Sequence, residues 1–355
     1  MTALSRTARR WLAMACCLVL PAQAAAAVAA SRPLQVTIVN DRLTLSVTHY
    51  PQVYLQGTID AGAPQRFAAL VRAGRITPGA DIYLDAHGAD RAAGMALGRL
   101  FRAGGMATHL GTPRQPRHAS VAMKTATCTD ACVYAYLGGL YRWTPSGRDR
   151  LALAAPPGDA RDVAAYLAAM GIDAGALAPA SPGNWTAERL LATGLANNGV
   201  LPATASYDLR APAPTLELRQ TDRKGVHRLT IRCAPGHTTV TAYDDVGMAR
   251  ARQVALRGGD AYFQLDGRKV LDQSRGGALA EGNALVIRRD YPPADLVDLV
   301  NAWSFGAWVD GRSAAFRDGF TLQLHPVHPQ LKVFYYACWR AAPWPPRAKK
   351  AAPAA

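Results

Sequence analysis

The sequence lacks any apolar run of about 20 residues, the length that a helix needs to cross a bilayer. The apolar run Trp11–Leu20 is shorter; it follows three arginines and precedes Pro21-Ala-Gln-Ala24. A basic start, a short apolar core and small residues at a cleavage site are typical of a secretory signal peptide. We therefore expect residues 1–24 to be removed near Ala24 and the mature protein to be periplasmic or secreted.

Acidic residues are scarce: 25 aspartates and glutamates stand against 40 lysines and arginines, which gives a net charge of +15. Removal of residues 1–24 would lower the charge to +12, because that segment holds three arginines and no acid. A basic exported protein suits an anionic component of the cell envelope or a peptide, and peripheral contact with a membrane surface is compatible with it. The compartment argues against nucleic acid. An alternative is that the arginine content reflects only the base composition of the genome.

Cysteine is also rare: four cysteines, Cys128, Cys132, Cys233 and Cys338, follow the expected cleavage site. An even number in an oxidising compartment predicts disulfides, and four cysteines allow three pairings. We favour Cys128–Cys132 and Cys233–Cys338, because each pair then lies within one expected domain. The Cys-x3-Cys spacing differs from the Cys-x2-Cys of redox proteins, so it indicates a structural staple. No histidine or second cysteine pair completes a zinc site nearby, and we expect no metal and no cofactor.

Strand and helix patterns alternate along the first half of the chain. The alternation of apolar residues over Leu34–Val47 predicts a β-hairpin that turns at Asn40-Asp41. Asp90 is the expected N-cap of a later helix. Further strands are expected at Val53–Leu55, Ala80–Leu84 and Ala107–Leu110. Strands separated by helices are typical of a parallel sheet with helical crossovers, so residues 33–210 are expected to form an α/β domain.

The second half changes character after the proline-rich linker 211–214. Short segments predict strands at Leu216–Arg219, Arg228–Cys233, Thr238–Tyr243, Ala261–Leu265, Ala284–Arg288, Phe305–Val309 and Phe320–Leu324. Two helices are expected among them, at Pro292–Ala302 and Pro329–Trp339. Residues 215–342 are therefore predicted to form a smaller, mainly antiparallel α+β domain of unknown family, and residues 343–355 a disordered tail.

Six segments of the first half occur in an order that matches one protein superfamily. They are Tyr54–Asp60, Ile82–Gly88, Gly94–Gly98, Cys128–Cys132, Tyr166–Asp173 and Trp185–Leu190. In this order they resemble the crotonase-like superfamily that includes the proteolytic subunit of Clp protease (ClpP). More closely, they resemble the uncharacterised periplasmic proteins related to that peptidase. The likeness covers roughly residues 50–200 and implies a crotonase-like fold. It also implies self-association as a homo-oligomer, because the superfamily often forms trimers or larger rings.

The resemblance implies a catalytic site, and this chain lacks its parts. In the catalytic relatives a serine at a strand-to-helix turn attacks a carbonyl, a histidine accepts its proton, and backbone N–H groups stabilise the oxyanion. Asp130 stands at the serine position, and no histidine occurs near Leu151–Ala155, where the base is expected. His87 stands where the oxyanion turn has its first glycine, and only Gly88 is retained. These losses indicate a degenerate site in a non-catalytic protein, a pseudoenzyme with a binding or scaffolding role.

Other interpretations of the turn stay open. In one, the protein is a peptidase-like hydrolase that uses Asp130 and His87 in place of serine and histidine, which requires contact between the two side chains. In another, the carboxylate of Asp130 only caps the helix that begins near Ala131. Asp85 and Asp90 flank His87 in sequence and would bind a metal with it if the three converge, but loop solvation and a helix cap explain them as well.

Overall fold

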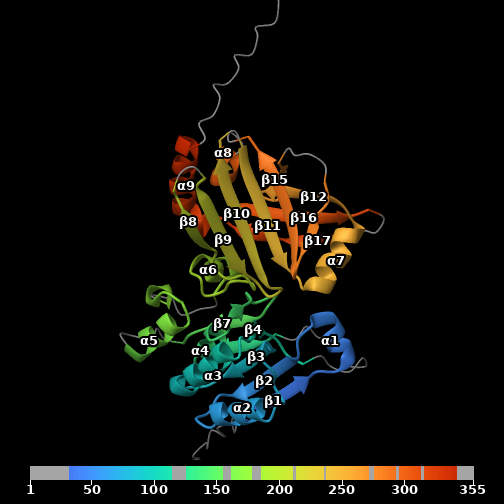
Figure 1. Ribbon diagram of the computed structural model, residues 1–355. Helices are drawn as coiled ribbons and strands as arrows, with labels where there is room; N and C mark the ends of the chain where they lie inside the picture. The colour runs from blue at the N-terminus through green and yellow to red at the C-terminus, as the bar shows by residue number, and fades with distance from the viewer. Residues whose placement is uncertain are drawn as a thin grey trace, which may run out of the picture.

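The computed structural model describes residues 32–113, 125–154, 161–177, 185–210, 213–235, 237–271, 276–292, 296–312 and 316–341. Two hydrophobic cores form within these ranges, one between Leu34 and Ala196 and one between Ala203 and Cys338. We refer to the parts around them as the N-terminal and C-terminal halves. In Figure 1 the blue and green first part of the chain lies below the yellow and red second part. The expected signal peptide and tail lie outside the described residues. Within those ranges, no helix has the length and apolar character needed to cross a membrane.

The strands of the N-terminal half form one mixed sheet that is parallel at its centre. Its apolar strand residues, such as Val53, Leu55 and Ile82, are fully buried. In order across the sheet lie β1 (Gln35–Val39), β2 (Gln52–Thr58), β3 (Asp81–His87), β4 (Ala107–Leu110) and β6 (Tyr141–Arg142), with β5 (Thr127–Thr129) beside β3 and β7 (Arg150–Ala152) beside β5. All pairs are parallel except β1 with β2. The predicted α/β architecture is confirmed.

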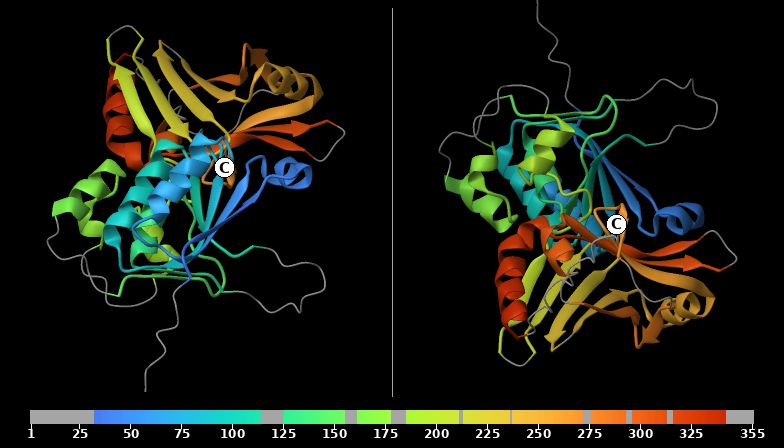
Figure 2. Two further views of the ribbon diagram at one scale, coloured as in Figure 1. Left: turned by 90° about the horizontal axis from the view of Figure 1, so that it is seen from below. Right: turned by 90° about the horizontal axis from the view of Figure 1, so that it is seen from above.

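Three helices, α2 (Ala63–Arg72), α3 (Arg91–Ala103) and α4 (Ala131–Leu137), pack side by side against this sheet (Figure 2). Asp90 caps α3 as predicted, because its Oδ1 accepts the N–H of Ala93 at 2.9 Å. Glycine at two positions of α3 lets α4 approach closely. A Cβ at Gly94 would overlap the backbone of Ala131, and one at Gly98 would lie 2.9 Å from the carbonyl oxygen of Tyr134. The remaining helices of this half are α5 (Arg161–Ala169), η1 (Ala174–Leu177) and α6 (Ala187–Ala192).

The β-hairpin predicted for Leu34–Val47 is wrong in its second arm. The first arm is β1, which pairs with β2, but the second arm is helix α1 (Arg42–Thr48). Asp41 is the physical reason, because its Oδ1 accepts the N–H groups of Leu43 and Thr44, both at 3.0 Å. An N-cap of this kind satisfies the free donors of a first helical turn and competes with a hairpin turn.

Two antiparallel sheets form the C-terminal half. The first has the order β14 (Leu279–Glu281), β15 (Ala284–Tyr291), β11 (His237–Asp245), β10 (Val226–Ala234), β9 (Thr215–Thr221) and β8 (Thr204–Asp208). The second has the order β13 (Lys269–Val270), β12 (Gly258–Leu265), β16 (Ser304–Gly311) and β17 (Arg317–Gln323). The helices are α7 (Met248–Arg257), α8 (Leu296–Asn301), η3 (His325–Val327) and α9 (His328–Ala341). All seven predicted strands and both predicted helices are present, whereas α7, β8, β13 and β14 were not predicted.

The boundary between the halves lies earlier than the sequence predicts. Strand β8 pairs with β9, and Ala203 belongs to the second core, although residues up to 210 were assigned to the first domain. Both predicted disulfides are present. Cys128 pairs with Cys132 across the start of α4, and Cys233 of β10 pairs with Cys338 of α9, which fixes α9 against the six-stranded sheet.

The turn between β9 and β10, residues 222–225, contacts the N-terminal sheet, and we call it the Arg223 turn. The guanidinium of Arg223 lies 3.7 Å from the ring centroid of Tyr50 and forms an ion pair with Asp81 at the start of β3. The two charged side chains are only 14% and 11% exposed. The hydroxyl of Tyr141 also donates to the carbonyl of Asp222 at 2.9 Å. A largely desolvated ion pair therefore joins the halves.

Candidate functional site

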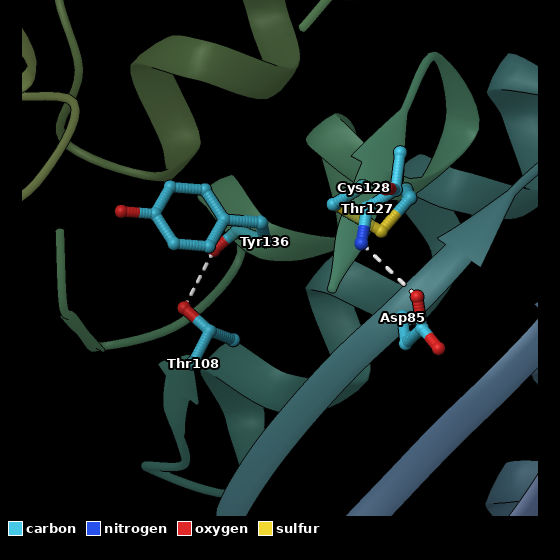
Figure 3. The surroundings of a disulfide bond; sticks show 6 residues. Asp85, Thr108, Thr127, Cys128 and Tyr136 are labelled. Carbon is cyan, nitrogen blue, oxygen red and sulfur yellow. Dashed lines mark hydrogen bonds between the residues drawn. A yellow bond between two sulfur atoms is a disulfide. The ribbon is translucent and has the colours of Figure 1, made fainter. Parts of the chain in front are cut away.

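Asp130 lies at a sharp turn between β5 and α4, the position that the sequence singled out. Its backbone has φ 54° and ψ −109°, a combination that L-residues rarely adopt. A strained strand-to-helix turn with positive φ is the shape that exposes a nucleophile in several hydrolase folds. The disulfide Cys128–Cys132 spans the turn, and Figure 3 shows it behind Thr127. Asp130 therefore lies at a strained strand-to-helix turn.

The carboxylate of Asp130 is engaged with backbone. Its Oδ1 accepts the N–H of Ala154 at 2.9 Å, and the backbone N–H of Asp130 donates to the carbonyl of Ala152 at 3.3 Å. Ala154 lies two residues beyond the end of β7, in the segment where the resemblance places the catalytic base. The Asp130 side chain makes no capping bond to α4, so the helix-cap interpretation is wrong about its partner. The carboxylate ties two neighbouring strands together.

The backbone N–H that follows the apex is also engaged. Ala131 donates to the carbonyl of Gly88 at 2.9 Å, so the retained glycine acts as an acceptor toward this turn. An oxyanion site needs free N–H donors aimed at the place where charge develops. The contact of Gly94 with the Ala131 backbone leaves little room for this segment to move. This donor is satisfied within the protein.

His87 ends β3 and points elsewhere. Its Nε2 lies 3.2 Å from the hydroxyl oxygen of Thr58, and its side chain is exposed. Across the ranges that the structure covers, no hydrogen bond or ion pair joins His87 to Asp130. The predicted contact is wrong, because the β2–β3 register places Thr58 directly opposite His87 and keeps the ring on that side.

The aspartates beside His87 have structural partners. Asp85 accepts the N–H of Thr127 at 3.0 Å (Figure 3) and the side-chain amide of Gln56 at 3.3 Å. Asp90 caps α3. No group of three or more His, Cys, Asp or Glu side chains converges to hold a metal ion among the residues with described positions. These bonds account for both aspartates without a metal.

Helix α4 is held in the core by side-chain hydrogen bonds to its backbone carbonyls, which the sequence did not predict. All seven of its residues are buried. The hydroxyl of Thr108 donates to the carbonyl of Tyr136 at 2.8 Å (Figure 3), and that of Tyr166 donates to the carbonyl of Tyr134 at 2.5 Å. Burial raises the pKa of the Tyr136 and Tyr166 phenols above the ordinary range. The Tyr136 hydroxyl donates to the carbonyl of Trp143 at 3.0 Å, so α4 is a fully buried core element whose hydrogen bonds serve packing.

A second group of ionisable side chains lies behind the Arg223 turn. His227 is 2% exposed; its Nδ1 lies 2.9 Å from Asp244 and its Nε2 3.1 Å from Asp222. The ring stacks on Phe320 with centroids 4.6 Å apart. The contact with Asp222 is an ion pair without hydrogen-bond geometry, since Nε2 has no hydrogen-bond partner. Burial opposes protonation of the ring, but the two carboxylates outweigh it and raise the pKa of His227 to about 9. At neutral pH this imidazole is protonated and cannot act as a base.

Comparison of the chain with protein-family models, with curated proteins and with solved structures gave no match.

Proposed function

We propose that the N-terminal half is a crotonase-like domain of the Clp-protease type that has lost its catalytic site. The protein then acts by binding or scaffolding in the periplasm after cleavage near Ala24. The observation that carries this proposal is the state of Asp130, which has the backbone of a nucleophile turn while its carboxylate is bonded to the N–H of Ala154. An ionised carboxylate only accepts hydrogen bonds, and it is a poor nucleophile for acyl transfer.

The arrangement around Asp130 supports the loss of each catalytic part separately. The nucleophile is replaced, Ala154 occupies the segment of the expected base, and the N–H of Ala131 is bonded to Gly88. A mutation of the serine alone would leave the other two parts in place. Because all three are absent together, the turn now serves the fold.

The retained strain also fits a structural role. A residue held in a sparsely populated backbone region costs about 1–3 kcal/mol and persists only where its surroundings enforce it. Here the disulfide Cys128–Cys132, the Ala131–Gly88 bond and the close contact with Gly94 enforce it. The turn is thus held by packing that needs no substrate.

The test uses the mature protein with a fluorophosphonate serine probe and with generic peptide and ester substrates. We expect neither labelling nor turnover. We also expect no labelling of Asp130→Ser, because the variant restores an alcohol without an imidazole or a free oxyanion donor. Turnover by the wild type that Asp130→Asn abolishes, and that Asp162→Asn in α5 leaves intact, would overturn the proposal in favour of the hydrolase.

A further inference from the structure

A hollow of about 280 Å³ lies on the outer face of the six-stranded sheet, far along the chain from Asp130. Arg219, Arg228 and Tyr243 lie opposite one another on β9, β10 and β11 and form one part of its lining. Asp245 and Glu281 form another part, at the ends of β11 and β14. The lining thus divides into a basic wall and an acidic wall.

The basic wall is preorganised and has donors to spare. The guanidinium carbon of Arg228 lies over the ring of Tyr243, 3.8 Å from its centroid. Both arginines bond to one carboxylate, Glu217, with Arg219 Nε at 2.6 Å and Arg228 Nη1 at 3.4 Å. A guanidinium carries five N–H donors, so most donors of this pair have no partner in the described parts of the chain. One carboxylate for two guanidinium groups leaves a net positive charge.

The acidic wall carries carboxylates whose negative charge complements the basic wall. Glu281 lies 3.5 Å from Arg288, an exposed pair, and Asp245 forms no side-chain bond to any residue that the structure describes. Asp245 lies two residues beyond Tyr243 on β11, so it is a diagonal neighbour of Arg228 across the sheet. Diagonal neighbours of this kind are separated by about 7–8 Å. A carboxylate without a side-chain partner among the described residues therefore lies on the same face of the sheet as surplus N–H donors.

We propose that this hollow binds a small zwitterion of dipeptide size, with its carboxylate on Arg219 and Arg228 and its ammonium on Asp245. Two extended residues place an ammonium and a carboxylate about 7 Å apart, so one ligand of this size can contact both walls of a hollow of about 280 Å³. The volume lies at the lower end of ligand sites, so the hollow suits a ligand smaller than a longer peptide. The inference goes beyond the proposed function and does not depend on the lost catalytic site, because every residue that it uses is in the C-terminal half.

The experiment is a calorimetric titration of the mature protein with glycylglycine. N-acetylglycylglycine lacks the ammonium group, glycylglycine amide lacks the carboxylate, and tetraglycine is twice as long as the proposed ligand. We expect saturable binding of glycylglycine and affinities lower by about tenfold for each of the other three. Equal affinity for the acetylated or the amidated peptide would overturn the charge assignment, and equal affinity for tetraglycine the size assignment.

Substitutions in the lining test whether glycylglycine binds in this hollow. Arg228→Gln and Asp245→Asn each remove one charge from the hollow and should weaken glycylglycine by about tenfold. Arg232→Gln is the matched control, since Arg232 lies on the same strand and the same face, four residues from Arg228. Asp245 is exposed, so its variant tests the site without risk to folding. Absence of saturation at about 10 mM glycylglycine, or unchanged affinity in Asp245→Asn, would overturn the proposal.

Discussion

Asp130 in the N-terminal half and the Asp222–His227–Asp244 group in the C-terminal half use carboxylates in opposite ways. Asp130 is half-buried in a strained backbone, and its partner is an uncharged N–H. His227 lies in regular strand β10, 2% exposed, between two carboxylates. The Asp130 turn has a strained backbone, but no titratable side chain is bonded to its carboxylate in the described structure. The His227 side chain has two carboxylate neighbours, but it is buried away from solvent. Catalysis requires both properties at one place, and neither of these two groups combines them.

The disulfides give the largest expected difference between the halves. Replacing Cys233 and Cys338 by alanine opens a link across 105 residues, and the loop-entropy relation gives a loss of about 5 kcal/mol. Replacing Cys128 and Cys132 opens a link across 4 residues, for which the same relation gives about 2 kcal/mol. Urea unfolding of both double variants under oxidising conditions measures the two values. Equal losses would mean that the short disulfide stabilises the Asp130 turn by more than chain entropy.

The second-largest expected effect on stability comes from the ion pair between Arg223 and Asp81, which joins the halves. Arg223→Met leaves the largely buried Asp81 with only His109 Nε2, 3.6 Å away, as a charged neighbour, and the loss of a partner from a buried pair costs up to about 3–5 kcal/mol. We expect calorimetric unfolding to change from one transition to two, because the pair joins the halves. Lys224→Met is the control, since Lys224 is the exposed neighbour in the same turn. A single transition at unchanged temperature in Arg223→Met would show that other contacts couple the halves.

The features that sequence reasoning found are those set by local patterns. The seven C-terminal strands follow from alternating apolar residues, and Asp90 follows from the capping preference of aspartate. Helix α7 was missed because only Ala251 and Val254 of its residues are buried, so arginines hide its apolar face. The N-cap at Asp41 overrode an alternation that suits a strand.

The contacts of the candidate site could be predicted only in part, because sequence reasoning finds only what local patterns set. The turn at Asp130 follows from its local pattern, but the partner of its carboxylate lies 24 residues away and depends on the pairing of β5 with β7. His227 and Asp244 are 17 residues apart, and only the register of β10 with β11 places them opposite each other. No local motif carries such contacts, because the intervening chain sets the register.

The pH dependence of the free energy of unfolding tests the Asp222–His227–Asp244 group. The pKa of His227 is raised from 6.5 to about 9 in the folded protein. Its contribution to stability is therefore complete below pH about 6.5 and is lost as the pH rises through about 9, by at most about 3 kcal/mol. We expect the stability difference between wild type and His227→Gln to shrink over this range in urea unfolding. A difference that does not change with pH would mean that the imidazole is neutral when buried.

The smallest effect tests the backbone of Asp130 itself. Asp130→Ala loses the bond to Ala154 and keeps a side chain at positive φ, whereas Asp130→Gly loses the same bond but adopts φ 54° without strain. The glycine variant should therefore be more stable than the alanine variant by about 1 kcal/mol, although glycine is the more flexible residue when unfolded. Asp130→Asn keeps an acceptor oxygen and should match the wild type within about 0.5 kcal/mol. If alanine is as stable as glycine in urea unfolding, the apex does not hold a positive φ in solution, and the turn loses its likeness to a nucleophile site.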